Sequence, residues 1–177
     1  MSSRSIRAAL IVLAALTAAP AHAGGGGAPA GMTPPPQTCR PGYARPDFAL
    51  LNRELRAARA RWVATGWRDY TYDVHQIAAP VLFPDTRVTV LGGRAVKSEV
   101  LPGQQGDPTP LSRQSMEQRF GDIARTLAYR RGTRCPEVKV RYDVRVGYPT
   151  SLYSGLGDAG IMDGFGEWTV SNVIPTR

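Results

Sequence analysis

Only a few acidic residues in this sequence have a spacing that could support metal chemistry. Asp158, Asp163 and Glu167 lie in or next to the glycine-rich segment 155–166, where three carboxylates could meet a hard cation such as calcium. Their spacing departs from the calcium-loop pattern, and Asp among glycines is also common in turns. A metal-dependent or hydrolytic site near Asp158 and Asp163 is therefore an alternative, and the preferred interpretation includes no cofactor and no metal.

His75 is the second candidate, since it is the one histidine beyond the first 23 residues. The apolar residues around it, including Tyr70 and Tyr72, alternate with polar ones and predict a strand with His75 on its polar face. A catalytic base needs a nucleophile or a carboxylate beside it, and the sequence indicates neither. The chain also lacks the G-x-S-x-G and H-E-x-x-H motifs and a phosphate-binding glycine loop. These observations favour a protein that is not an enzyme.

The two cysteines, Cys39 and Cys135, are the remaining reactive pair. An even number of cysteines in an oxidising compartment predicts a disulfide, which here would join the segments on either side of the helical regions. A zinc site would need more Cys or His ligands, and a redox-active pair usually has the C-x-x-C spacing. We therefore expect a structural Cys39–Cys135 disulfide.

The N-terminal residues have the order that a secretory signal peptide requires. Two arginines precede the apolar run 8–19, and a triplet of small residues ends at Ala23. This pattern predicts a signal peptide over residues 1–23 with cleavage between Ala23 and Gly24. Because Gly24 is not a cysteine, the protein is not expected to be a lipoprotein. We expect an exported protein, periplasmic or extracellular, that does not span a membrane after cleavage.

Composition divides the rest of the chain in two. Residues 24–46 are rich in Gly and Pro without an apolar period, which predicts a flexible tether. Residues 47–177 are enough for one core and predict a single domain, expected to be monomeric. The formal net charge of +8 falls to about +6 when cleavage removes two arginines and no acidic residue, and this positive charge suits contact with an anionic envelope polymer or an envelope protein. The basic residues are scattered along the chain, which argues against a specific nucleic-acid site.

Two stretches have the apolar period of amphipathic helices. The first, over residues 48–65, follows the capping residue Asp47 and ends before Gly66. The second opens at Ser115, which forms a capping box with Gln118, and ends near residue 130. Their apolar stripes consist of Leu51, Leu55, Ala58 and Trp62 in the first helix and Met116, Phe120, Ile123 and Leu127 in the second.

The segments after each helix alternate as half-buried strands do. After the first helix come a strand near residues 70–77, a loop over 78–85 and a hairpin formed by 87–91 and 94–101. After the second helix come strands at Glu137–Tyr142, Tyr148–Ser154 and Glu167–Ile174; in the last, Trp168, Val170 and Asn172 would share a face.

The order of elements, helix, three strands, helix, three strands, predicts an α+β fold. Both helices are expected to pack on one face of an antiparallel sheet of about five or six strands. The tripeptide Tyr72-Asp73-Val74 recurs at residues 142–144, which leaves open whether the two halves are an internal repeat.

Several motifs together resemble one known family. The pattern W-x-x-Y-x-Y ends with Tyr70 and Tyr72, a glycine hairpin and the Ser115 helix follow, and a final group completes it: Tyr142, Asp143, Gly147, Tyr148, Pro149 and Thr150. Over about residues 50–174 the chain resembles the bacterial exported family called domain of unknown function 6174. The resemblance implies an extracytoplasmic domain without an assigned activity. A cysteine pair that members often have after the Tyr-x-Tyr strand is missing here.

The preferred functional hypothesis is an exported, non-enzymatic binding or structural module of the cell envelope. The resemblance provides no catalytic residues, and Tyr148 and Pro149 are interpreted as structural. An inhibitor of an exported hydrolase is a further alternative, based on shape alone.

Overall fold

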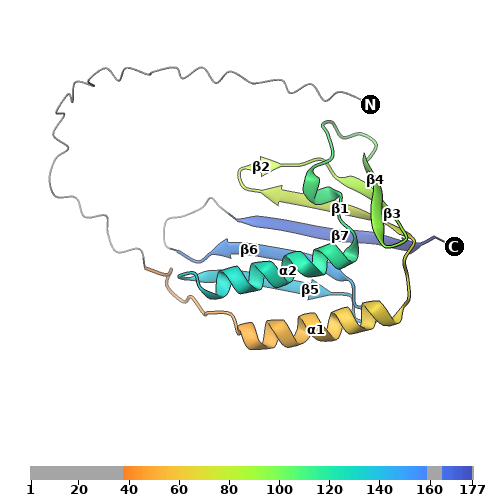
Figure 1. The fold of residues 1–177 in the computed structure, drawn as a ribbon. Helices are drawn as coiled ribbons and strands as arrows, with labels where there is room; N and C mark the ends of the chain where they lie inside the picture. Colours follow the sequence, from red (N-terminus) through yellow and green to blue (C-terminus); the bar gives the residue numbers. More distant parts are fainter. Residues whose placement is uncertain (1–37, 159–164, 177) are drawn as a thin grey trace, which may run out of the picture. The chain divides into compact units, whose positions relative to one another are not determined.

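The computed structural model describes residues 38–158 and 165–176. The predicted signal peptide with its cleavage point at Ala23 and Gly24, residues 24–37 of the predicted tether, and Asp163 lie outside these ranges. The elements are α1 (Phe48–Ala64), β1 (Tyr70–Ala78), β2 (Val81–Leu82), β3 (Thr86–Leu91), β4 (Arg94–Val100), the short 3₁₀ helix η1 (Pro110–Ser112), α2 (Met116–Arg131), β5 (Pro136–Tyr142), β6 (Pro149–Leu156) and β7 (Gly166–Pro175) (Figure 1).

The strands form one antiparallel sheet, and the fold is α+β as predicted. Six strands follow the order β4-β3-β1-β7-β6-β5, and β2 pairs with β1 as a seventh. Both helices lie on the same face, where α2 contacts β5 and β6 and α1 contacts α2 (Figure 1). The prediction of a loop over 78–85 was wrong in part, because Leu82 and Val81 pair with the end of β1. The prolines around β2 masked this short strand in the sequence.

The sheet order does not support an internal repeat. The first Tyr-Asp-Val tripeptide lies in β1, which is central between β3 and β7. In the second, Tyr142 ends β5 at the edge of the sheet and Asp143 begins the following turn. The two tripeptides therefore occupy places that are not equivalent.

Neither helix of the described part of the chain is long and apolar enough to cross a membrane.

The predicted helix ends and apolar stripes are confirmed. The Asp47 carboxylate accepts hydrogen bonds from the amides of Ala49 and Leu50 at 2.9 Å, and both halves of the Ser115–Gln118 capping box are present. The residues of both apolar stripes are buried, except that Leu51 is only partly buried where it packs against the core. From the sheet, the core receives Tyr70, Tyr72, Val74, Val88, Val90, Val138, Leu152, Trp168 and Val170.

Arg119 on α2 lies inside this core and is only 1% exposed. Its guanidinium carbon lies 4.8 Å from the centre of the Trp168 ring and 5.2 Å from that of Tyr72. Its Nε donates a hydrogen bond to the Tyr72 hydroxyl at 3.1 Å, and that hydroxyl donates to the Gln114 carbonyl. Contacts with aromatic faces and hydrogen bonds offset the free-energy cost of removing a guanidinium from water. Arg119 therefore fastens α2 to two strands of the sheet.

The expectation that Asn172 shares the core face of Trp168 and Val170 was wrong. A register shift in the β1–β7 pairing interrupts the alternation, and Asn172 has a φ of +52°. As a result Asn172 is exposed, and its Nδ2 donates to the Asp73 carboxylate at 2.8 Å. Val173 packs against the core in its place.

The predicted disulfide between Cys39 and Cys135 is present. Residues 38–46 fall in the range predicted to be a tether, yet they belong to the same compact unit as the sheet. The Tyr43 hydroxyl donates to the Pro136 carbonyl at 2.7 Å, and Arg45 donates to the Arg131 carbonyl at 2.6 Å. Composition could not reveal these contacts, because each joins residues far apart in the sequence.

Candidate functional site

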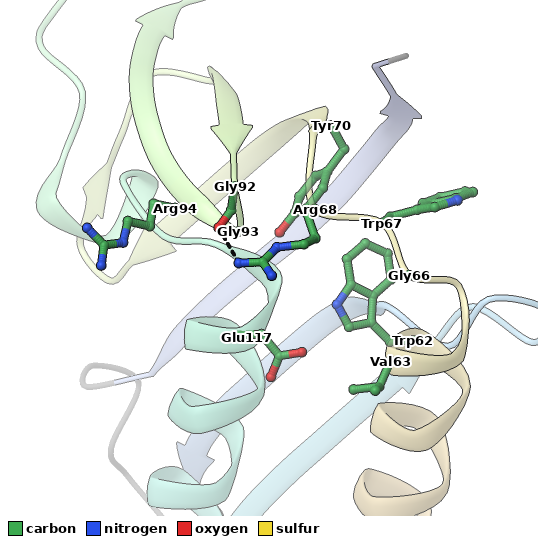
Figure 2. A pocket seen from close by; sticks show the side chains of 10 residues that line it. All are labelled: Trp62, Val63, Gly66, Trp67, Arg68, Tyr70, Gly92, Gly93, Arg94 and Glu117. Atoms are coloured by element: carbon green, nitrogen blue, oxygen red, sulfur yellow. Dashed lines mark hydrogen bonds between the residues drawn. The ribbon is translucent and has the colours of Figure 1, made fainter.

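A hollow of about 450 Å³ opens where the end of α1, the start of α2 and the β3–β4 turn meet. Figure 2 shows the side chains around it. They come from three separate stretches of the chain, which the fold brings together: Trp62, Val63, Gly66, Trp67, Arg68, Tyr70, Gly92, Gly93, Arg94 and Glu117.

Three aromatic rings form one wall of the hollow. Gly66, with a φ of +68°, lets the chain reverse after α1, so that Trp67 and Tyr70 return beside Trp62. The Trp62 ring meets Trp67 edge-on at 5.8 Å and Tyr70 edge-on at 5.2 Å. Edge-to-face contacts are favourable for aromatic pairs. The wall is therefore held in place without a ligand.

The β3–β4 turn forms the opposite side and is tied to the segment before β1. The amide of Gly93 donates to the Arg68 carbonyl at 2.8 Å, and the amide of Gly92 donates to Asp69 Oδ1 at 2.5 Å. Arg68 in turn donates from its guanidinium to the Gly92 carbonyl at 3.1 Å (Figure 2). Both glycines have positive φ values, as the predicted hairpin requires.

Tyr70 connects the floor of the hollow to the first turn of α2. Its hydroxyl accepts a hydrogen bond from the amide of Met116 at 2.8 Å. Burial raises the pKa of Tyr70 to about 12, above the ordinary value for tyrosine. Tyr70 thus satisfies a helix-terminal amide that would otherwise have no partner. Its place in the Tyr-x-Tyr motif is explained by this bond and by its contact with Trp62.

The polar groups around the hollow are mainly hydrogen-bond donors. Arg68 and Arg94 are exposed at its rim; the Arg68 guanidinium lies between Trp62 and the β3–β4 turn, and the Arg94 side chain points away from the rings (Figure 2). The indole nitrogen of Trp62 lies on the edge of its ring turned towards Glu117. Glu117 is the one carboxylate in the lining, and its Oε2 accepts from Arg59 Nη2 at 2.8 Å and Nε at 3.2 Å. The arrangement suits a ligand that joins a flat apolar group to an anion or another acceptor.

His75 lies on the exposed outer face of the sheet, away from the helices, as its alternation predicted. Its Nδ1 lies 2.5 Å from Asp85 Oδ1, a partner that the sequence did not indicate. Asp85 Oδ2 also accepts from Gln104 Nε2 at 2.8 Å. Because Asp85 follows the β1–β2 hairpin, only the tertiary fold brings it to His75. The three side chains join β1 to two loops, and the residue paired with His75 on β7 is Thr169.

A second ion pair lies next to His75 on the outer face. Arg87 on β3 binds both oxygens of the Asp73 carboxylate, at 2.7 and 2.8 Å, and Asn172 donates to the same carboxylate. The hydrogen bonds from Arg87 lower the pKa of Asp73. Asp73 is buried although it is on the polar face. It holds β1, β3 and β7 together.

Of the acidic residues expected at a metal site, Asp158 and Glu167 lie in the described ranges, and the metal-ligand group found there does not contain both. Asp158 lies beside the disulfide, where it pairs with Cys39, and Glu167 lies on β7. Within residues 38–158 and 165–176, the one group of three metal-binding side chains is Cys39, Cys135 and Asp158, whose ligand atoms lie within 4.8 Å. Both sulfurs are used by the disulfide. Asp158 Oδ1 is buried and accepts no hydrogen bond from the described residues.

The Gly-Tyr-Pro-Thr segment ends the turn between β5 and β6 and begins β6, and its glycine rests on α1. Asp143 Oδ1 accepts from the amides of Arg145 and Val146, and the amide of Gly147 donates to the Asp143 carbonyl at 3.1 Å. Gly147 has a φ of +86°, and a Cβ there would lie 2.2 Å from the carbonyl oxygen of Ala58. The absence of a side chain therefore allows the turn to touch the helix backbone.

The other residues of the motif extend the same packing. Tyr148 meets the Trp62 ring edge-on at 6.4 Å, and Pro149 is buried at the start of β6. Tyr142 stacks on Phe120 at 6.3 Å, and Thr150 is half-buried. The motif thus positions Trp62, which forms a wall of the hollow. Sequence reasoning missed the hollow itself, because Trp67, Arg68 and Glu117 are ordinary residues until the fold brings them together.

The comparisons with known proteins identify a family and nothing more specific. A family model described as "Family of unknown function (DUF6174)" matches residues 54–175. The match begins inside α1 and ends in β7, so it includes every residue that lines the hollow. No curated protein and no solved structure matches the chain.

Proposed function

Because this chain belongs to the family of unknown function DUF6174, whose description assigns no activity, we propose from the geometry that it is an exported, non-catalytic binding module. Its ligand occupies the hollow between α1, α2 and the β3–β4 turn. The ligand class that fits is a flat apolar group carrying an anionic substituent, as part of an envelope protein or an anionic envelope polymer.

The observation that carries this proposal is the combination of an aromatic wall with a rim of donors. Trp67 and the exposed Val63 provide most of the accessible apolar surface above the buried rings of Trp62 and Tyr70, and Arg68 and Arg94 provide positive charge. Ligand pockets commonly combine apolar lining with a few convergent polar groups. Glu117 is engaged by Arg59, and the Tyr70 hydroxyl holds the α2 amide, which favours binding over proton transfer.

Export is supported by two independent features. The first is the order of charge, apolar run and small residues that predicts a signal peptide ending at Ala23. The second is the Cys39–Cys135 disulfide, because such bonds persist in oxidising compartments.

The test uses the side-chain N–H signals of the three tryptophans in an NMR titration. We expect 2-naphthoate to shift the Trp62 and Trp67 signals and to leave that of Trp168 unchanged, because Trp168 is outside the hollow. The neutral analogue 2-naphthamide should bind more weakly. The double variant Arg68→Gln/Arg94→Gln should weaken naphthoate binding at least about tenfold, as expected for loss of two charge-assisted contacts.

A matched control is available on α1. Arg53→Gln/Arg56→Gln removes the same charge from exposed positions outside the hollow and should leave binding unchanged. Absence of a shift at millimolar naphthoate, or equal affinity for naphthamide, would contradict the proposal.

The metal alternative rests on the buried, unpaired Asp158 Oδ1 and has its own test. A calcium titration followed by thermal melting should give no shift if the protein is a binding module of the proposed kind. A rise of several degrees that Asp158→Asn abolishes would favour a metal site at that residue.

A further inference from the structure

The outer face of the sheet has a second hollow, separate from the aromatic one. It has a volume of about 490 Å³ and lies over β5, β6 and β7 on the face that the helices leave open. Its lining is mostly polar, and four of the side chains have hydroxyl groups. The lining residues are Lys139, Arg141, Thr150, Ser151, Tyr153, Glu167 and Thr169.

The strand register arranges these residues in two rows across the sheet. In one row Arg141 faces Ser151, and Ser151 faces Thr169. In the next row Lys139 faces Tyr153, and Tyr153 faces Glu167. Each row therefore begins with a cation on the edge strand β5 and continues over hydroxyl groups towards β7.

The charges are divided between the edge and the floor of this hollow. Lys139 has a side chain that is 73% exposed, and Arg141 is also exposed. The nearby Glu137 carboxylate already has cationic partners, because Arg40 binds its Oε1 at 2.7 Å and Lys139 Nζ lies 3.8 Å from the same atom. Glu167 is the one carboxylate in the lining, at the far end from the cations.

This division of charge selects among anionic ligands. Lys139 and Arg141 are two residues apart on a strand, so they offer positive charges roughly 7 Å apart. Glu167 can accept hydrogen bonds from hydroxyl groups, but it repels a chain that presents phosphate groups without hydroxyl donors beside them. A sugar chain with carboxylates provides both anions for β5 and hydroxyl donors for Glu167. A nucleic acid or a polyphosphate would place its negative charge against Glu167.

We propose that the outer face of β5, β6 and β7 binds an acidic polysaccharide, with its carboxylates at Lys139 and Arg141 and its hydroxyl groups over Ser151, Thr169 and Glu167. The charge complementarity of this face carries the inference, which is independent of the hollow beside the helices. The sheet provides the long, open surface that a linear polymer needs.

The test measures retardation of the full chain in native gels that contain alginate, followed by calorimetry with alginate oligosaccharides. We expect binding to alginate, none to neutral dextran, and weaker binding to duplex DNA and polyphosphate. The double variant Lys139→Gln/Arg141→Gln should lose at least about tenfold in affinity for alginate. Glu167→Gln should weaken alginate binding and strengthen DNA binding, a change of opposite sign that a general loss of stability would not produce.

The control Arg53→Gln/Arg56→Gln changes the net charge by the same amount on α1 and should bind alginate as the unmodified chain does. Thermal melting of each variant checks folding, and Arg141→Gln alone replaces the double variant if that variant melts early. The proposal is overturned by absent alginate binding at low salt, by an equal loss in the control, or by DNA binding as tight as alginate binding.

Discussion

Replacing Gly147 by alanine tests how the β5–β6 turn is fixed to α1. Gly147 has a φ of +86°, a backbone conformation that costs an L-residue roughly 1–2 kcal/mol. The added Cβ would also lie 2.2 Å from the Ala58 carbonyl oxygen and 2.8 Å from Arg61 Cβ. Neither atom can rotate away, because one is helix backbone and the other is the first atom of a side chain. Overpacking of this kind costs typically about 1–3 kcal/mol.

The two contributions together predict a loss of about 2–5 kcal/mol in the free energy of unfolding for Gly147→Ala. Gly103→Ala separates them, since Gly103 has a similar φ of +84° but nothing within 4 Å of the new Cβ. The control should lose only about 1–2 kcal/mol. Urea titrations followed by circular dichroism give both values.

A difference of less than about 0.5 kcal/mol between the two variants would refute the reasoning, because it would mean that the turn can leave α1 at no cost. If Gly147→Ala fails to fold while Gly103→Ala folds, the contact with Ala58 is supported in its strongest form. Such a result would also explain why glycine begins the Gly-Tyr-Pro-Thr segment.

Further predictions concern the disulfide and two titrating groups. The variant Cys39→Ser/Cys135→Ser, which removes a link between residues 96 apart, should lose about 4 kcal/mol of unfolding free energy in urea, and an unchanged midpoint would contradict this. The lowered pKa of Asp73 means that its ion pair with Arg87 stabilises the fold above the unfolded pKa of about 3.9 and is lost as the pH falls below it. Melting temperatures should therefore fall less steeply on acidification in Asp73→Asn than in the unmodified chain; equal slopes would contradict the assignment. Burial raises the pKa of Tyr70 to about 12. The contribution of its protonated hydroxyl to the stability of the fold is therefore fully present below the unfolded pKa of about 10 and is lost as the pH rises towards 12. Ultraviolet titration should show one fewer high-pKa tyrosine in Tyr70→Phe, and an unchanged titration would contradict the burial argument.

The features predicted correctly from the sequence are those that local rules determine. Asp47, Ser115 and Gln118 cap helices through residues two or three positions away, and the glycine pair at 92 and 93 needs only its own backbone freedom. The apolar periods then show which faces of the helices and strands pack together, and this predicted the α+β layers. These signals lie within one element or its immediate neighbours.

The features that sequence reasoning missed depend on contacts between distant residues. Asp85 reaches His75 only because β2 folds back on β1, and Asn172 turns away from the core because of a register shift. Arg119 is charged, so no hydrophobic pattern includes it, although it is buried between two aromatic rings. The aromatic hollow was missed for the same reason, since its residues come from three stretches that are far apart in the sequence.

The disulfide also determines how the domain would respond to a pulling force. Tension applied at residue 38 would pass through Cys39 directly into Cys135, at the start of β5, and would bypass everything between them. Both helices and the strands β1 to β4 lie within that bypassed stretch. If the other end were held at residue 176, the load would fall on the strands β5, β6 and β7 rather than on the helices. Chemical reduction would remove this protection, and stretching experiments would then record a much longer extension on unfolding.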